Sequence, residues 1–156
     1  MAVGDATSVQ AKTGAGFKLF YDATGTMTDP SSPTPAWTQI EGMKSGALPS
    51  PDKPEIDVTT TADTVKAYIP GIGSIADLSL ELNFYPENAV HQKLVSEVLY
   101  EETPRYWKIE GATMTFTFMG YLKSASASFG VDAALTLPLT LKVTTEPTVT
   151  FTTAGA

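Results

Sequence analysis

The chain has 156 residues, a formal net charge of −7 and no cysteine. This length allows one domain with a sizeable core, and the absence of thiols excludes disulfides, cysteine metal ligands and cysteine nucleophiles. The acidic balance, with Arg105 as the single arginine, argues against a protein that binds nucleic acid specifically. No apolar run approaches the roughly 20 residues that span a bilayer, and the start of the chain lacks the pattern of a Sec-type signal, so we expect no membrane insertion.

The first third of the chain predicts a flexible arm followed by two short strands. Residues 1–15 are small and polar and predict the arm, and a single domain is expected over 16–152. Alternation in GFKLFY (16–21) predicts a strand, and the Asp, Gly, Ser and Pro content of 22–35 predicts a loop. AWTQIEGM (36–43) predicts the second strand.

A long stretch at about 43–76 has no clean strand or helix period. It begins with prolines, continues as the threonine-rich EIDVTTTADTVKAYIPGI (55–72), and closes on Ile-Pro-Gly-Ile. We predict a long loop here. Loops of this length are either functional or disordered, so the segment needs a role.

Three later runs alternate apolar and polar residues along their whole length. They are LSLELNFY (78–85), TMTFTFMGYL (113–122) and LTLPLTLKVT (135–144). A period of two predicts strands with one buried and one polar face. Pro138 lies on the polar face and predicts an edge or a bulge, because proline cannot donate to a ladder. A short last strand is expected around Val149 and Phe151.

One helix is expected between the first two of these runs, over about 88–100. Val90, Leu94 and Val98 form an apolar stripe, and Asn88 is a suitable N-cap. RYWKIEG (105–111) then returns as a strand. The fold class is therefore mainly β with one flanking helix, an antiparallel two-sheet sandwich or barrel.

The sequence offers little catalytic chemistry. His91 is the only histidine, and we place it on the solvated side of the helix, beside Gln92 and Lys93. Glu55 and Asp57 could be half of a glycosidase pair or calcium ligands, but such a short pattern is weak, and a solvated strand face explains it better. We therefore expect no enzyme, no catalytic residue, no metal site and no cofactor.

The order of elements around the 55–72 stretch carries a resemblance. The features are Trp37-x-x-Ile40-x-Gly42 before a proline-bearing stretch, Glu55-Ile56-Asp57-Val58-Thr59, then Asp63, Tyr68 and Pro70-Gly71-Ile72, the strand after them, Asn83-Phe84-Tyr85-Pro86 before the helix, and a Phe-rich strand ending at Gly120. From about Phe17 to Val143 this order resembles the major tail tube proteins of long-tailed, siphovirus-type bacteriophages.

The resemblance implies a structural virion protein. In that family, whose fold is shared with the type VI secretion tube protein, subunits form hexameric rings that stack into a hollow tube for DNA ejection. The implied partners are further copies of the chain, a tape-measure protein, a baseplate initiator and a tail terminator, and DNA passes through without specific binding. The implied location is the virion tail, with assembly in the host cytoplasm. The extra C-terminal immunoglobulin-like domain of some relatives is not expected.

The resemblance also implies two sets of site residues. Inter-subunit or inter-ring contacts are expected from the long loop at Asp57, Thr59, Asp63 and Tyr68. The lumen wall is expected on polar strand faces at Ser79, Glu81, Asn83, Thr113, Thr115 and Thr117. Lys123 and Lys142 would suit such a wall only if carboxylates paired with them, because free cations would retain phosphate.

Two alternatives stay open at this point. A small carbohydrate-binding β-sandwich would use an aromatic platform drawn from Trp37, Tyr106, Trp107 and Tyr121, although these residues equally suit a core or a subunit interface. A type VI secretion tube protein is the other alternative, because fold alone does not decide function.

Overall fold

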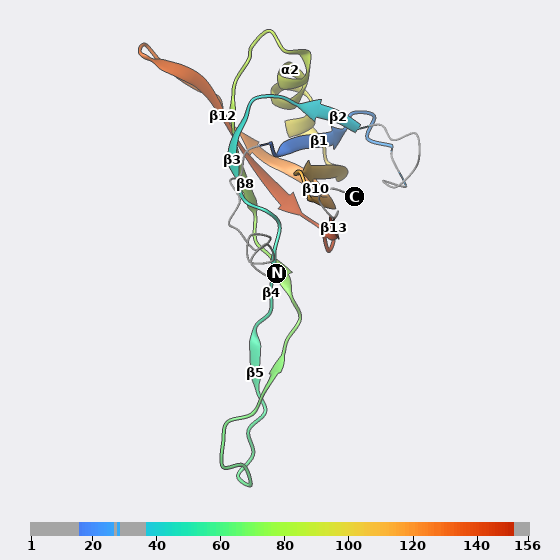
Figure 1. Ribbon diagram of the computed structural model, residues 1–156, viewed down its shortest axis with the longest axis vertical. Coiled ribbons are helices and arrows are strands. Elements are labelled where there is room, and N and C mark those ends of the chain that lie inside the picture. Colours follow the sequence, from blue (N-terminus) through green and yellow to red (C-terminus); the bar gives the residue numbers. More distant parts are fainter. Residues whose placement is uncertain (1–15, 27, 29–36, 152–156) are drawn as a thin grey trace, which may run out of the picture.

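The computed structural model describes residues 16–26, 28 and 37–151 of the chain (Figure 1). The expected arm at 1–15 lies outside these described residues. The strands are β1 (Lys18–Asp22), β2 (Trp37–Ile40), β3 (Met43–Gly46), β4 (Pro51–Asp52), β5 (Glu55–Asp57), β6 (Tyr68–Pro70), β7 (Ser74–Ile75), β8 (Leu78–Asn83), β9 (Arg105–Glu110), β10 (Met114–Ala125), β11 (Ser128–Gly130), β12 (Ala133–Val143) and β13 (Thr148–Phe151); the helices are α2 (Ala89–Ser96) and the 3-10 helix η1 (Val98–Tyr100). The mainly β class with one α-helix is confirmed for this part of the chain.

Nine strands form one continuous antiparallel sheet in the order β2-β1-β9-β10-β12-β8-β3, with β11 added to β12 and β13 added to β10. The two ends of this order, β2 and β3, are joined in the chain by only Glu41 and Gly42. The backbone N–H of Asn83 in β8 donates to the Gly42 carbonyl over 2.7 Å. The sheet therefore bends back on itself and closes at this corner, which gives the sandwich-like fold that the sequence predicts.

The long strand β10 belongs to both layers of the fold. Its first half, up to Gly120, pairs with β9 and β13, and from Gly120 onward it pairs with β12. We call the layer of β3, β8, β12, the end of β10 and β11 the β8 layer. The layer of β2, β1, β9, the start of β10 and β13 is the β9 layer. Gly120 lies where the layers divide, and a Cβ there would approach the Lys142 carbonyl oxygen to 2.3 Å, so only glycine fits.

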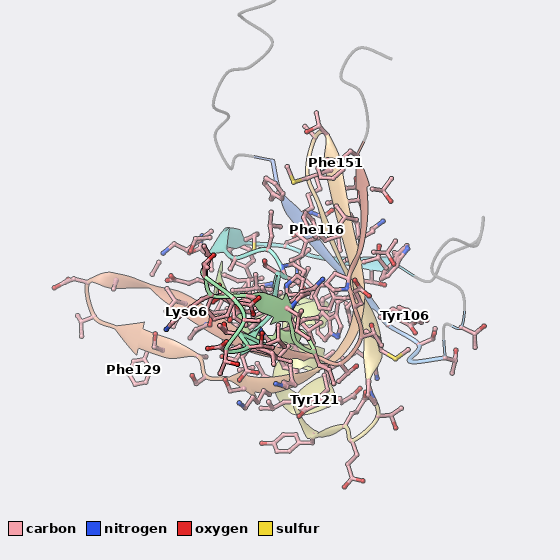
Figure 2. All side chains as sticks on the ribbon, turned by 90° about the horizontal axis from the view of Figure 1, so that it is seen from below. Lys66, Tyr106, Phe116, Tyr121, Phe129 and Phe151 are labelled. Atoms are coloured by element: carbon pink, nitrogen blue, oxygen red, sulfur yellow. The ribbon has the colours of Figure 1, made fainter. Side chains whose placement is uncertain are left out.

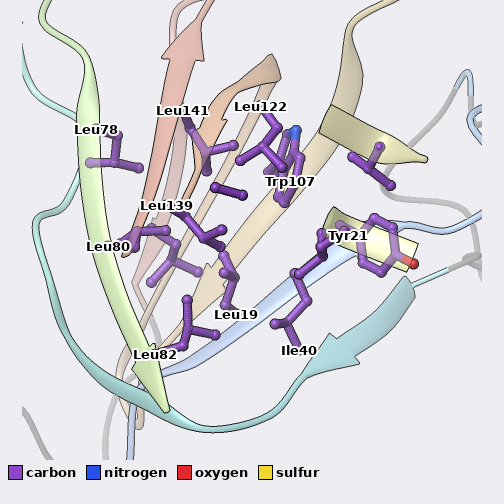
Figure 3. Close-up of a cluster of buried hydrophobic side chains, with 14 of the residues drawn as sticks. Leu19, Tyr21, Ile40, Leu78, Leu80, Leu82, Trp107, Leu122, Leu139 and Leu141 are labelled. Carbon is purple, nitrogen blue, oxygen red and sulfur yellow. The ribbon is translucent and has the colours of Figure 1, made fainter. Parts of the chain in front are cut away.

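The core fills the space between the two layers (Figure 3). Alternate residues of the strands supply it, as the period of two predicts: Leu19, Tyr21, Ile40, Leu78, Leu80, Leu82, Trp107, Ile109, Phe118, Leu122, Leu137, Leu139 and Leu141 are all buried. Trp107 is fully buried, and its indole N–H donates to the Gly120 carbonyl over 3.0 Å. Each such side chain contributes roughly 1.5–3 kcal/mol on burial, so this cluster dominates the stability of the body.

The helix α2 begins as predicted, and its burial differs from the predicted apolar stripe at His91 and Val90. Asn88 caps it, because its Oδ1 accepts the N–H groups of Val90 (2.9 Å) and His91 (3.2 Å). The buried residues of α2 are His91 and Leu94, Val98 is buried in the following η1, and Val90 is only half-buried. His91 is 0% exposed, so its predicted position on the solvated side is wrong.

His91 is buried because both ring nitrogens have backbone partners. Nδ1 accepts the Tyr85 N–H over 3.0 Å, so the proton lies on Nε2, which is 2.7 Å from the Glu41 carbonyl oxygen. The ring is stacked against Phe84 and Tyr85. A neutral imidazole thus joins the β2–β3 corner to the end of β8, and this satisfied pairing removes the usual penalty for burying a polar group.

The predicted long loop at 43–76 is instead a projecting two-stranded arm. Its first residues form β3 inside the main sheet, and the chain then leaves the body as two short antiparallel ladders, β4 with β7 and β5 with β6 (Figure 1). Residues 58–67, between β5 and β6, form the tip of the arm. The loop prediction is wrong because strands of two or three residues are too short to show a period of two.

Pro138 occupies the kind of position that its chemistry requires. On one side it pairs with Glu81 of β8. On the other side, the partner strand is interrupted between Ala125 and Ser128, which pair with Leu139 and Thr136. The missing proline N–H therefore costs little at this irregularity, as expected.

Candidate assembly surfaces

The first candidate surface is the arm, which has two different faces. In the β5–β6 ladder Ile56 lies opposite Ile69, while Asp57 lies opposite Tyr68. Directly opposed residues share a face of a ribbon, so the isoleucines form an apolar face and Asp57 and Tyr68 form a mixed one. Ile56 and Ile69 are 46% and 48% exposed, because nothing in the described chain packs behind them.

The polar contact candidates on the arm are used within the arm itself. Asp57 accepts the Thr59 N–H (2.9 Å), and the Thr59 hydroxyl in turn accepts the Ala67 N–H (2.9 Å). Asp63 accepts both the N–H (2.7 Å) and the hydroxyl (3.1 Å) of Thr60. The pKa of Asp57 is held below its usual range mainly by a hydrogen bond with the Thr59 hydroxyl, and further by the bond from the Thr59 N–H. These side chains therefore shape the tip, in the manner of Asx-turns.

Of the four predicted contact residues, Tyr68 keeps a large exposed apolar surface. Sequence reasoning missed its neighbours, which are the exposed apolar side chains of Ile56, Val58, Val65, Ile69 and Ile72. The signal was present in the alternation of Glu55-Ile56-Asp57-Val58. A two-stranded ribbon is marginal in water by itself, so this apolar face is suited to covering by another surface.

The second candidate surface is the polar side of the sheet, opposite the core. Ser79, Glu81 and Asn83 of β8 lie opposite Thr140, Pro138 and Thr136 of β12. These six residues are therefore on one face of the β8 layer.

The threonine candidates reach the same side of the continuous sheet through β10. Thr115 and Thr117 lie opposite Glu110 and Lys108 of β9, and all four alternate with buried or half-buried core positions. Thr113 was predicted on the same strand face, but it precedes β10 and lies in the turn before this strand.

Carboxylates pair with the lysines of this face. Asp77 lies between Lys123 (2.5 Å) and Lys142 (3.4 Å), and Glu81 is 3.4 Å from Lys44. The hydrogen bond from Lys123 is the main cause that holds the pKa of Asp77 low, and the same bond raises the pKa of Lys123. Lys123 and Lys142 are thus both paired with a carboxylate, which is what the sequence analysis required of lysines on a lumen wall.

The remaining polar groups do not assemble a catalytic or metal site. Within the described residues no group of three or more His, Asp or Glu side chains could hold a metal ion, and no helix is long and apolar enough to cross a membrane. Arg105 pairs with Glu101 and donates to the Asp22 carbonyl (2.7 Å). Trp107 is in the core and cannot stack on a sugar, so the carbohydrate-binding alternative loses one of the four aromatic residues of its platform.

Comparison with solved structures places this arrangement among known proteins. A chain from the tail of an empty GTA particle, computed with helical refinement and C6 symmetry, superposes with a TM-score of 0.69 at 14% identity, over 92% of this chain and 100% of that chain. The protein has the fold of a tail tube protein. The SPP1 tail tube matches this tail tube fold with a TM-score of 0.64 at 11% identity, over 90% of this chain and 80% of that one.

A chain of an extracellular contractile injection system, from a PVC sheath–tube complex, shares the tail tube fold with a TM-score of 0.62 at 13% identity, over 97% and 99% of the two chains. No protein-family model and no curated protein sequence matches the chain. The tail tube fold is therefore established by structure at identities where the sequences have diverged almost completely.

Proposed function

We propose that the protein is a non-enzymatic structural subunit that assembles into stacked hexameric rings and forms the tube of a virion tail. The observation that carries this proposal is the match of the whole tail tube fold to a chain of a particle tail refined with C6 symmetry. The projecting arm supports it, because an exposed apolar ribbon suits a contact with another subunit.

In this proposal the arm makes the inter-subunit and inter-ring contacts. Asp57, Thr59 and Asp63 set the shape of the tip, and Tyr68 supplies contact area together with Ile56 and Ile69. Baseplate, terminator and tape-measure proteins are the expected partners at the two ends and inside the tube, and assembly takes place in the host cytoplasm.

The polar side of the β8 layer is proposed as the channel wall, with Ser79, Glu81 and Asn83 facing the lumen. Thr115 and Thr117 pair with β9 and lie on the polar face of the β9 layer, so they are outside this proposed wall. Asp77 and Glu81 neutralise nearby lysines, so the wall offers few free cations to the phosphates of passing DNA. Assembled Asp77→Asn tubes should retain duplex DNA at low salt and release it at high salt, whereas wild-type tubes should not retain it. Equal retention by both would contradict this wall.

The function is tested by negative-stain electron microscopy of the purified protein, dilute and concentrated, with light scattering on the same samples. Hollow tubes or rings of uniform width are expected to form above a threshold concentration. Particles that stay monomeric at every concentration, and also when mixed with preformed tube ends, would overturn the proposal.

A contractile system is the second candidate, because the sheath–tube complex matches the fold nearly as well. The tube of a contractile system carries a sheath around it, whereas the tube of a siphovirus-type tail does not. Sheath protein in particles purified with this chain would therefore favour the contractile reading.

A further inference from the structure

The β11–β12 hairpin (126–135) is a second ribbon that projects from the body. The last described bond between the end of β8 and this ribbon joins the Phe84 N–H to the Leu135 carbonyl over 2.9 Å. From Leu135 the hairpin continues by itself for three more residues to its turn at Asp132, roughly 10 Å. In Figure 1 it leaves the body at the end that carries α2, whereas the arm leaves at the opposite end.

The tip of this hairpin, residues 129–132, is apolar and exposed. Phe129 is 88% exposed and Val131 is 103% exposed, and Figure 2 shows Phe129 standing clear of the body. Val131 is in the two-residue turn, where glycine, asparagine and aspartate are the usual residues. The chemistry of the turn does not account for a valine there, so the two apolar side chains suit a contact with another surface.

A groove of about 470 Å³ lies between α2 and the strands β1 and β2. Ala23 and Thr38 line it from the strand side, and Ala89, Val90 and Lys93 line it from the helix. Val90 is only half-buried, so part of its apolar surface is open to this groove. Pockets of roughly 300–1,000 Å³ hold ligands the size of several side chains, so the groove has room for the two apolar side chains of the hairpin tip.

The charges of the tip and the groove are complementary. Asp132 is the single charged residue in 126–135. Lys93 lines the groove, and among the described residues neither Asp132 nor Lys93 belongs to an ion pair. Glu97 lies one turn further along the helix and would repel an aspartate. The charges therefore favour the half of the groove between Ala89 and Lys93.

The tip and the groove belong to different copies. Phe129 and Val131 are too exposed to fill the groove of their own chain. In the proposed assembly the arm is directed at the next ring, so the tube axis follows the arm. A rotation about this axis keeps the height of every feature, which makes the tip of one copy level with the groove of its neighbours in the same ring. Stacked copies would instead bring the arm of one ring to this end of another.

We infer that the hairpin tip of one copy is seated in the α2 groove of a neighbouring copy in the same ring. Phe129 and Val131 then contact the apolar lining of the groove, and Asp132 pairs with Lys93. The inference rests on the proposed function and adds a contact that does not involve the arm. Because each copy offers one tip and one groove, the contact is head-to-tail and closes into a ring rather than a two-fold dimer.

Cysteine pairs test the contact directly, because the chain has no native cysteine. Ala89→Cys/Val131→Cys, oxidised in the assembled state, should give a ladder of covalent oligomers on a non-reducing gel. Each single variant should give no ladder. Ala89→Cys/Val65→Cys is the matched comparison, because Val65 is also an exposed valine but lies on the arm, and it should give no ladder either.

Two outcomes of this experiment would overturn the inference and leave the tube function intact. A ladder from the Val65 pair would assign the groove to an arm from an adjoining ring. The absence of a ladder from the Val131 pair, in tubes that have formed normally, would exclude the hairpin as the occupant. A wild-type chain that forms no tubes would instead overturn the proposed function, together with the contact that rests on it.

The ion pair is tested by exchanging its charges. Asp132→Lys and Lys93→Asp should each raise the concentration at which assembly begins by roughly fivefold at low salt, and the double exchange should return it close to the wild-type value. Both residues are exposed, so the stability of the unassembled chain should change little. Single exchanges without effect, or a double exchange without recovery, would mean that the two side chains do not meet.

The apolar part of the contact is tested at Phe129. Phe129→Ser should raise the concentration at which assembly begins by roughly thirtyfold, as for an interface hot spot. Its exposure means that the unassembled chain should fold with unchanged stability, which urea denaturation checks. Assembly of a stably folded Phe129→Ser variant at the wild-type concentration would show that the groove does not hold this side chain.

Discussion

The body and the arm of this protein use the same alternation of apolar and polar residues with opposite results. In the body, Leu82, Trp107 and Leu137 come from three strands and are fully buried against one another. In the arm, Ile56 and Ile69 lie on one face of a ribbon and remain nearly half exposed. The difference is that the body folds a second layer over its apolar face, whereas the arm has one layer only.

The body and the arm are therefore held in their conformations by different interactions. The body is stabilised by burial of apolar surface, which the isolated chain completes by itself. The arm is held by short ladders and by turns at its tip, such as the Asp63–Thr60 bonds, which contribute little net stability in water. Folding therefore leaves apolar surface on the arm exposed, and the proposed assembly would bury it.

The largest expected effect comes from breaking the body at Trp107. Trp107→Ala removes the largest fully buried side chain and its hydrogen bond to the Gly120 carbonyl. The free energy of unfolding should fall by about 3–5 kcal/mol, as for other core aromatics. Urea denaturation of the unassembled chain measures this. Tyr68→Ala in the arm is the control, and an equal loss there would contradict the division between body and arm.

The next effect concerns the β2–β3 corner, which His91 joins to the end of β8. His91→Phe keeps a ring in place but leaves the Tyr85 N–H and the Glu41 carbonyl without their partner. Two buried unsatisfied groups should cost roughly 2–4 kcal/mol in the free energy of unfolding. The measurement is again urea denaturation.

Lys93→Ala, on the exposed side of the same helix, is the matched control and should be nearly neutral. A neutral His91→Phe would mean that water replaces the imidazole at both backbone groups, and that the histidine does not fix the corner.

The arm itself should show a small effect on folding and a large one on assembly. Ile56→Ser/Ile69→Ser removes the apolar face of the ribbon, and the stability of the unassembled chain should change by no more than about 0.5 kcal/mol. Light scattering should nevertheless show a strong rise in the concentration needed for assembly. Lys66→Ala, also on the arm, is the control, and assembly at the wild-type concentration by the double serine variant would exclude the arm as a contact.

The body could be predicted from the sequence because each of its signals is local. The alternation at 78–85 and 135–144 marks strands with one buried face, and Asn88 marks the start of the helix. The signal that His91 is buried was also present, since it lies three residues before Leu94 and seven before Val98. It was missed because a histidine between Val90 and Gln92 looks polar until its two backbone partners are known.

The arm and the β11–β12 hairpin could not be predicted in the same way. The ladders at Glu55–Asp57 and Tyr68–Pro70 are too short to show a period, and their pairing depends on residues more than ten positions apart. The strand β11 of the hairpin has only three residues and shows no period either. The resemblance to tail tube proteins implied that the arm makes contacts between subunits, and the structure identifies the exposed apolar residues of the arm.

The smallest effect sharpens the comparison on the polar side of the body, at Asp77. The hydrogen bond from Lys123, with a further contribution from Lys142, holds the pKa of Asp77 below its usual value. A carboxylate whose folded-state pKa is lowered contributes stability that is complete above its unfolded pKa of about 4, and this stability is lost as the pH falls through the folded-state pKa. The raised pKa of Lys123 keeps the ion pair intact up to and above the ordinary lysine value of 10.5.

The stability difference between wild type and Asp77→Asn should therefore be flat across neutral pH, begin to shrink near pH 4, and disappear once the pH is below the lowered folded-state pKa of Asp77. Urea is the denaturant of choice, because guanidinium salts would screen the exposed charges. Asp132→Asn, at an exposed aspartate in the β11–β12 hairpin, is the control and should show no such pH dependence. A difference for Asp77→Asn that persists at low pH would mean that the side chain stabilises the sheet through its shape rather than its charge, and the wall would then lose its main reason to carry an aspartate between two lysines.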